Sequence, residues 1–217
     1  MSSLDSEEQQ VEAIKKWWKE NGVAVVIGIV LGVGGLVGWR SWTTYQDNQG
    51  AAASILYEQM SGRAAVGDRG GAVDVAEHLA AEYGGIGYAD LARLSLARMY
   101  YQGGEVDQAV AQLEAVREKA EVEELKHVAA LRLARMHLDR GDLDSAQAAL
   151  AGVAVGAFDG IADEIRGDIL AARGDRAGAR SAYQRALELT TNSSGRVLLQ
   201  MKLDDLAGDA IPGDGAS

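Results

Sequence analysis

The chain has 217 residues, with 32 Asp and Glu against 21 Lys and Arg, and a formal net charge of −11 at pH 7. Such an acidic chain would be repelled by a phosphate backbone, so we expect no nucleic acid among its partners. The sequence contains no cysteine, which excludes disulfides and thiolate chemistry and is compatible with an oxidising compartment.

An uncharged apolar run, VAVVIGIVLGVGGLVGW, extends from Val23 to Trp39. As a helix these 17 residues would span about 26 Å, the low end of what crosses a bilayer core. All four tryptophans flank the run, at positions 17, 18, 39 and 42, where indole rings suit the two membrane interfaces. The pattern predicts a tail over residues 1–22 and one transmembrane helix in the lipid bilayer over residues 23–40.

Two other interpretations fit the apolar run less well. A cleaved signal peptide needs a small-residue cleavage site, whereas residues 39–42 read WRSW. A dinucleotide-binding turn could use Gly32, Gly34 and Gly38, but the run is too long for the strand that must precede such a turn. We therefore expect the segment to remain as an anchor.

Five glycines fall on one side of the predicted transmembrane helix, opposite larger residues such as Ile29 and Leu36. They are Gly28, Gly32, Gly34, Gly35 and Gly38. Glycine lets another backbone approach closely, although it is also common in membrane helices generally. We expect this glycine face to pack against a second helix in the membrane.

Charges beside the anchor predict its orientation. Lys15, Lys16 and Lys19 precede it closely, whereas Arg40 alone follows closely. Lysine and arginine favour the cytoplasmic side of a membrane. The sequence therefore predicts a single-pass protein with a cytoplasmic N-terminus and an exported C-terminal domain.

A repeated pattern follows the anchor. The segment at residues 94–99, LSLARM, recurs in part at residues 131–136 as LRLARM, 37 residues later. Downstream, the turn at Gly104 recurs at Gly141 and again, after 33 residues, at Gly174. Each unit reads as a helix, a turn in which glycine adopts a positive φ, and a second helix.

Small residues recur where the two helices of a hairpin must approach, at Ala97, Ala134 and Gly167. A degenerate earlier copy fits Ala76, 33 residues before Ala109. We expect residues 63–71, rich in glycine and charge, to form a loop. Residues 196–206 carry apolar positions that suit a helix capping the last repeat.

The spacing and the small residues resemble the tetratricopeptide repeat, although its consensus proline and much of its first-helix aromatic set are absent. One hairpin cannot bury its apolar stripe alone, so the copies should stack. The predicted fold is all-α, with a single N-terminal transmembrane helix followed by a tetratricopeptide-like helical-hairpin repeat domain over residues 41–206. An ordinary helical bundle is the alternative. Residues 207–217, with proline, glycine and aspartate, predict a disordered tail.

No pattern in the sequence indicates catalysis. His78, His127 and His137 are scattered without metal-ligand spacing, and there is no nucleophile elbow or phosphate loop. We expect a protein that is not an enzyme and that carries no cofactor, no metal and no catalytic residue.

A binding surface is the remaining candidate site. In repeats of this type the first helices line a concave groove, here with Leu94, Arg98, Tyr101, Leu131, Arg132, Arg135, Leu138 and Asp139, followed by Glu164 and Asp168. Guanidinium groups beside apolar surface could hold an extended or helical peptide. Alternatively, the arginines could simply pair with neighbouring acids.

Four segments together resemble the YfgM-type ancillary subunit of the bacterial SecYEG translocon: QVEAIKKWWKENG, LGVGGLVGWRSW, GDRAGARSAY and MKLDDLA. The resemblance implies an inner-membrane protein with a periplasmic domain that associates with SecYEG and with a PpiD-like membrane-anchored chaperone. It implies an adaptor or co-chaperone that helps periplasmic chaperones act on exported polypeptides. The alternative is a regulator of an envelope stress-response pathway.

Overall fold

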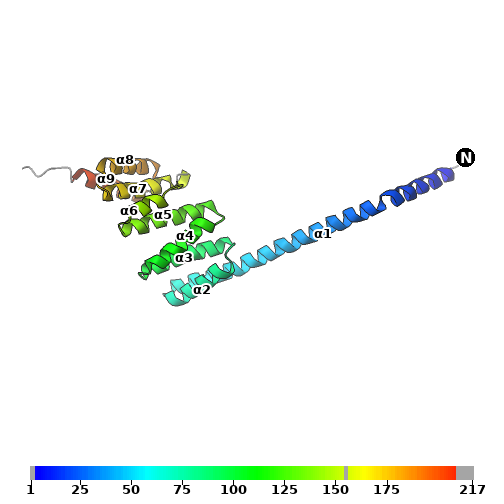
Figure 1. Ribbon diagram of the computed structural model, residues 1–217, viewed down its shortest axis with the longest axis horizontal. Coiled ribbons are helices and arrows are strands. Elements are labelled where there is room, and N and C mark those ends of the chain that lie inside the picture. The colour runs from blue at the N-terminus through cyan, green and yellow to red at the C-terminus, as the bar shows by residue number, and fades with distance from the viewer. Residues whose placement is uncertain (1–2, 154–155, 209–217) are drawn as a thin grey trace, which may run out of the picture. The chain divides into compact units, whose positions relative to one another are not determined.

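The computed structural model describes residues 3–153 and 156–208, and every regular element in this part of the chain is helical (Figure 1). This confirms the all-α prediction. The helices are α1 (Ser3–Ala65), α2 (Arg69–Glu82), α3 (Gly87–Gln102), α4 (Val106–Lys119), α5 (Glu123–Asp139), α6 (Leu143–Ala149), α7 (Asp159–Ala172), α8 (Arg176–Leu189) and α9 (Ser193–Gly208), with a 3-10 turn, η1 (Gly156–Phe158), before α7. The chain divides into two compact units, Met1–Ala52 and Ala53–Ser217.

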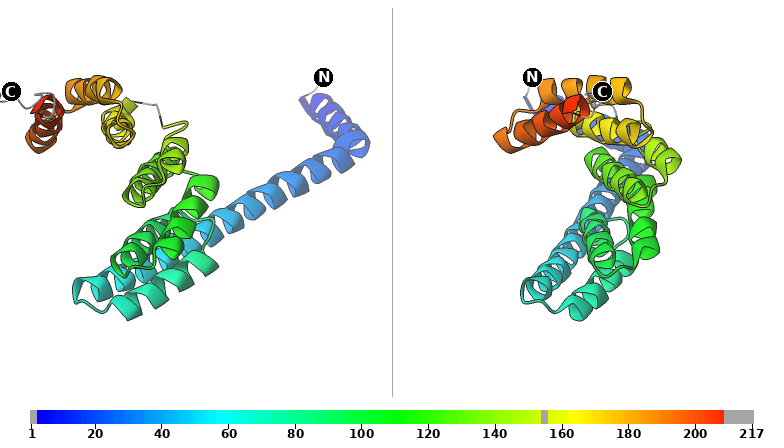
Figure 2. Two further views of the ribbon diagram at one scale, coloured as in Figure 1. Left: turned by 60° about the vertical axis from the view of Figure 1, so that its left-hand side comes forward. Right: turned by 90° about the vertical axis from the view of Figure 1, so that its left-hand side faces the viewer.

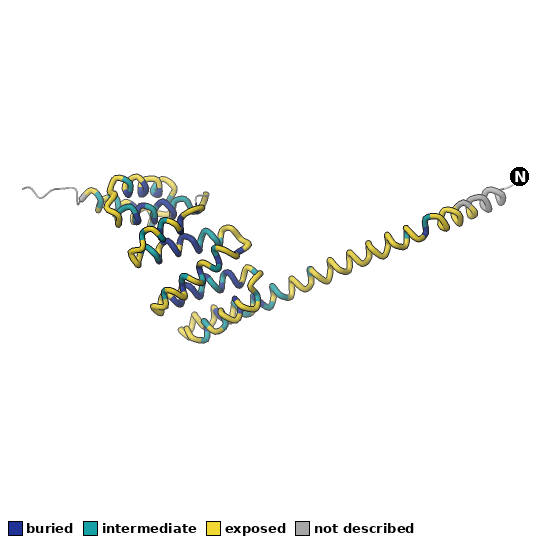
Figure 3. Tube along the Cα trace, in the orientation of Figure 1, coloured by how far each residue is buried: buried dark blue, intermediate teal, exposed yellow. Residues whose placement is uncertain are grey.

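The first unit is made of α1, which continues unbroken through the predicted tail and the apolar run. This helix is long and apolar enough to cross a membrane, with a mean hydropathy of 2.2 in its most apolar window. Its apolar side chains are exposed along the run (Figure 3), as lipid-facing residues are in the absence of lipid. The limits 1–22 and 23–40 stay predictions from hydropathy.

The second unit is a row of helical hairpins. Its first hairpin pairs the end of α1, residues 53–65, with α2, and the two segments lie side by side in Figure 2. Ala53 and Met60 share the hydrophobic core with Ala72 and Leu79 of α2. The next hairpins are α3/α4, α5/α6 and α7/α8, so the sequence pattern corresponds to hairpins throughout the repeat region.

The first hairpin begins in a different register from the predicted copy. Its turn contains Gly67, which lies 37 residues before Gly104, so Ala72 rather than Ala76 takes the place of Ala109. The predicted loop over residues 63–71 is correspondingly short, because α1 runs to Ala65 and α2 begins at Arg69. The glycines at the start of α2 stay helical because the Asp68 carboxylate caps the helix and accepts a hydrogen bond from the Gly71 amide at 2.9 Å.

The turn glycines adopt the conformation that the sequence predicts. The φ angles are +80° at Gly67, +81° at Gly104, +74° at Gly141 and +80° at Gly174. Residues with a Cβ atom rarely adopt this left-handed region, because the Cβ comes too close to the backbone. A glycine therefore ends the first helix of each hairpin and lets the chain reverse.

Small residues bring the two helices of each hairpin together. Ala97, Ala134 and Ala109 are buried in the core. At Gly167 a Cβ atom would lie 2.4 Å from the ring of Tyr183 on α8, so only glycine allows this approach. The predicted role of the small residues, to let the two helices of a hairpin approach closely, is therefore confirmed most clearly at Gly167.

Helix α9 covers the last hairpin. It buries Leu199 against Ala179, Tyr183 and Ala186 of α8. The helix runs from Ser193 to Gly208 and so begins three residues before the predicted capping helix. Most of the predicted disordered tail, residues 209–217, lies outside the described residues.

Candidate functional site

The first helices of successive hairpins share one surface, called here the first-helix face, which is formed by residues 53–65 of α1 and by α3, α5 and α7. Two contacts connect α3 to α5. The Tyr101 hydroxyl donates a hydrogen bond to Asp139 at 2.6 Å, and the Arg132 guanidinium donates one to the Leu94 carbonyl at 3.1 Å. These contacts place predicted groove residues of neighbouring hairpins side by side.

Ion pairs extend the first-helix face from α5 to α7 and α9. Arg135 of α5 lies 3.9 Å from the Glu164 carboxylate of α7. Lys202 of α9 contacts Glu164 at 2.9 Å and Asp168 at 2.7 Å. The ammonium group also lies 5.5 Å from the centroid of the Tyr183 ring, a cation–π distance. At the α7 end of the first-helix face, the carboxylates of Glu164 and Asp168 are therefore neutralised by the positive charges of Arg135 and Lys202.

Three of the predicted groove residues are largely taken up by the core. Leu94 and Leu131 are each only 5% exposed and belong to the hydrophobic core, so neither is available to a ligand. Leu138 is half-buried and packs against the same core. Burying these side chains stabilises the fold more than leaving them exposed would, because burial removes their apolar surface from water. The predicted groove residues that remain exposed on these helices are Arg98, Tyr101, Arg132, Arg135 and Asp139.

Arg98 and Arg132 form a concentration of positive charge on this acidic chain. Burial, together with the nearby charge of Arg98, lowers the pKa of the Arg132 guanidinium. Within the described residues the Arg98 guanidinium has no hydrogen-bond or ion-pair partner. The alternative that the groove arginines pair with neighbouring acids therefore holds for Arg135, which lies beside Glu164, and does not hold for Arg98.

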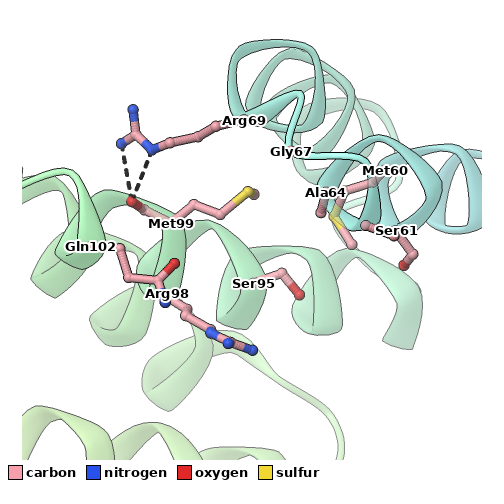
Figure 4. Close-up of a pocket in the computed structure, with 10 residues that line it drawn as sticks. Met60, Ser61, Ala64, Gly67, Arg69, Ser95, Arg98, Met99 and Gln102 are labelled. Carbon is pink, nitrogen blue, oxygen red and sulfur yellow. Dashed lines mark hydrogen bonds between the residues drawn. The ribbon is translucent and has the colours of Figure 1, made fainter.

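A pocket of about 430 Å³ opens on the first-helix face between the first and second hairpins (Figure 4). Arg98 is the only predicted groove residue that lines it. The lining residues are Met60, Ser61, Ala64, Ala65, Gly67, Arg69, Ser95, Arg98, Met99 and Gln102. This pocket is not among the sequence-based predictions, although the 37-residue spacing, extended back to Gly67, places Ser61 and Ala64 on the same surface as Arg98.

Two contacts fix one wall of this first-hairpin pocket. Arg69, at the start of α2, donates hydrogen bonds to the Met99 carbonyl at 3.0 and 3.2 Å and to the Glu105 carboxylate at 2.6 Å. Met60 and Met99 are nearly buried, and their side chains extend toward each other in Figure 4. Thioether side chains are flexible and adapt to irregular apolar groups.

Two of the three histidines, His127 and His137, have side-chain contacts within the fold. The rings of His127 and Phe158 lie 5.6 Å apart, and His137 Nδ1 lies 3.7 Å from the Asp142 carboxylate. No group of three His, Cys, Asp or Glu side chains among the described residues is arranged to hold a metal ion.

Comparison with known proteins agrees with the hairpin array. The chain matches the family described as tetratricopeptide repeat-like domain over residues 15–208, which confirms the predicted repeat fold. No solved structure matches the chain.

Three curated relatives carry the same name. The ancillary SecYEG translocon subunit of Escherichia coli (strain K12) is 33% identical over 207 residues, covering 95% of this chain and 100% of the relative. That of Haemophilus influenzae (strain Rd) is 30% identical over 200 residues, covering 92% and 97%. That of Aggregatibacter actinomycetemcomitans is 30% identical over 206 residues, covering 95% and 100%.

Proposed function

Because the chain belongs to the family of ancillary SecYEG translocon subunits, we propose that it is a membrane-anchored adaptor that is not an enzyme. In this role it associates with a SecYEG translocon and helps periplasmic chaperones, including a PpiD-like membrane-anchored chaperone, act on exported polypeptides. The relatives' name supports the association with a translocon.

The observation that carries the adaptor role is the first-helix face. It presents the exposed Arg98, Arg132 and Arg135 beside Tyr101 on a chain whose net charge is −11. Arginine donors bind carboxylate groups in fixed geometry, and tyrosine adds apolar contact area with a polar end. Such a surface suits the binding of a polypeptide partner.

The anchor supports a place in the bacterial inner membrane, with the tail in the cytoplasm and the hairpin domain in the periplasm. A Cβ atom added at Gly28, Gly32, Gly34, Gly35 or Gly38 would meet nothing within 4 Å. The glycine face is therefore open for another transmembrane helix to approach. In our proposal a membrane subunit of the translocon or its chaperone occupies this face.

Affinity capture tests the proposal. The tagged full chain is extracted in a mild detergent, and its partners are identified by mass spectrometry alongside a Gly28→Leu, Gly32→Leu double variant. We expect the wild type to recover translocon subunits and a periplasmic chaperone, and the glycine variant to recover markedly fewer, because leucine blocks close approach of a second backbone.

A matched control adds bulk to the other side of the same helix, as Val33→Phe with Val37→Phe. This control should capture the same partners as the wild type. Recovery of no translocon subunit by the wild type would overturn the proposal. Capture of a cytosolic regulator instead would favour the role in envelope stress signalling.

A further inference from the structure

We propose that the first-hairpin pocket binds an extended peptide segment in which a large apolar side chain adjoins a carboxylate side chain. The apolar group enters the pocket, and the carboxylate pairs with Arg98. This inference rests on the proposed adaptor function, since it names the chemistry of the polypeptide that the first-helix face would hold.

The pocket exists because the first hairpin has small residues where the later hairpins have large ones. Ser61 and Ala64 stand 37 residues before Arg98 and Tyr101. In the following interval Tyr101 reaches across to α5 and bonds to Asp139. No equivalent side chain extends from Ala64 toward α3, so the space between these first helices stays open.

The interior of the pocket suits an apolar group of limited size. Met60, Ala64 and Met99 provide apolar lining, and the volume of about 430 Å³ is at the low end of the range of about 300–1,000 Å³ for ligand sites. That space takes one or two side chains rather than a whole helix. The two thioethers can adjust to the shape of the group that enters.

The charge at the rim favours an anionic group beside that side chain. Arg98 has no partner among the described residues, and Arg132 adds a second positive charge nearby. Arg69, at the opposite wall, is already neutralised by Glu105. A carboxylate at Arg98 would form a charge-assisted hydrogen bond that the protein itself does not supply.

Two polar side chains at the pocket favour a peptide over a lipid chain. The side chains of Ser61 and Gln102 make no hydrogen bond within the part of the chain that the structure describes. A peptide backbone carries both N–H donors and C=O acceptors, so it can satisfy both groups while its side chain is inserted. The methylene chain of a fatty acid offers them neither a donor nor an acceptor.

Fluorescence polarisation with defined peptides tests the proposal. The full chain in phosphatidylcholine nanodiscs is titrated against labelled Gly-Ser-Gly-Phe-Glu-Gly-Ser-Gly, a peptide with Gln for Glu, and a peptide with Ala for Phe. We expect the Phe-Glu peptide to bind about tenfold or more tightly than either of the others, as a charge-assisted contact and a buried aromatic group each predict. Arg98→Gln should abolish the preference for Glu over Gln, and Ala64→Leu should weaken the binding of the Phe-Glu peptide.

Two variants serve as matched controls. Arg180→Gln removes an exposed arginine of α8, which lies outside both the pocket and the first-helix face, and Ala148→Leu adds the same bulk at an exposed alanine of α6. Both should bind the Phe-Glu peptide like the wild type. Circular dichroism confirms that each variant is folded, and because Arg98 and Ala64 are both exposed, their substitution should leave the fold intact.

Three results would overturn the proposal: no preference for Glu over Gln, an equal loss in Arg180→Gln, or tighter binding of oleate that Arg98→Gln and Ala64→Leu remove. The last would assign the pocket to a lipid. Each of these leaves the translocon capture by the wild type unaffected, so failure of this inference is distinguishable from failure of the adaptor function.

Discussion

At Gly167 the absence of a side chain allows α7 to lie against Tyr183 of α8. The tyrosine cannot easily move away, because its ring is buried, its hydroxyl donates a hydrogen bond to Asp168 at 2.8 Å, and Lys202 lies over its ring. Burial and the bond to Asp168 both raise the pKa of Tyr183, so the hydroxyl stays protonated and remains a donor. This one position therefore controls the packing of the last hairpin.

We predict that Gly167→Ala destabilises the repeat domain by about 1–3 kcal/mol, the usual cost of overpacking a core. Gly62→Ala is the matched control, because Gly62 also lies in a helix but a Cβ there meets nothing within 4 Å. Helix propensity alone should make that control more stable by about 0.5–1 kcal/mol. Chemical denaturation of both variants measures the difference, and equal effects would contradict the packing argument.

Asp90 shows the opposite situation, a charge held in the core at a cost. Its side chain is buried, and burial raises the pKa of the carboxyl, only partly offset by Arg93 at 3.7 Å, while the charge of Glu121 raises it further. A folded-state pKa above the unfolded value means that ionisation favours the unfolded state. The stability contributed by the protonated carboxyl of Asp90 is therefore fully present below the unfolded-state pKa and is lost as pH rises through the folded-state pKa.

We expect Asp90→Asn to raise the melting temperature at pH 7, because the amide stays neutral at every pH. The gain should shrink as pH falls below the folded-state pKa of Asp90 and vanish below its unfolded-state pKa. Thermal unfolding followed by circular dichroism over this range checks the prediction. A lower melting temperature at pH 7 would mean that the Asp90–Arg93 pair stabilises the fold after all.

The packing of α9 against α7 depends on charge more clearly than that of the other helices. Lys202 joins it to Glu164 and Asp168 of α7. Burial opposes the charged ammonium, yet the hydrogen bonds to both carboxylates raise the pKa of Lys202. Without the lysine, two carboxylates would face each other with no cation of α9 between them.

We therefore predict that Lys202→Gln loosens α9 while leaving the first hairpins intact. Amide hydrogen exchange in α9 should accelerate roughly tenfold or more, in keeping with hydrogen bonds to charged groups, with little change in α3. A helix such as α3, in the interior of the array, serves as the internal control in the same spectra. Uniform acceleration throughout the domain would show that α9 is part of one cooperative unit.

For the whole molecule, the lack of cysteine permits a direct test of the proposed membrane orientation. Single substitutions Glu12→Cys in the tail and Glu114→Cys on α4 place one exposed thiol on each side of the anchor. With a membrane-impermeant maleimide, we expect the α4 thiol to react in intact spheroplasts and the tail thiol to react only after lysis. The reverse pattern would contradict the orientation predicted from flanking lysines.

The hairpin array could be predicted because its determinants are local. Gly104, Gly141 and Gly174 each determine their own turn through a backbone conformation that other residues avoid. The predicted register of the first hairpin is wrong because the glycines within the first turn of α2 resemble a loop in sequence. What the sequence could not reveal was burial across hairpins: Leu94 fits a groove by spacing, yet neighbouring helices cover it.

The candidate site was predictable only in part, for the same reason. Arg98 and Arg135 occupy equivalent positions at a spacing of 37 residues, yet only Arg135 has a carboxylate opposite it. That difference depends on Glu164, which belongs to the α7/α8 hairpin, where the repeat spacing is different. The pocket forms because the side chains of Ser61 and Ala64 are small. Small side chains leave a pocket only where the facing helix does not fill the space, and the facing helix is known only from the structure.

The 37-residue interval that relates Gly67, Gly104 and Gly141 has a consequence for how this protein can change. Each hairpin is held mainly by its immediate neighbours, as in other repeat arrays, so residues on its outer surface contribute little to the rest of the fold. Ser61 and Ala64 can therefore be exchanged for other side chains without repacking α7 or α9. Such an array can acquire a new binding preference by altering one hairpin and leaving the others as they are.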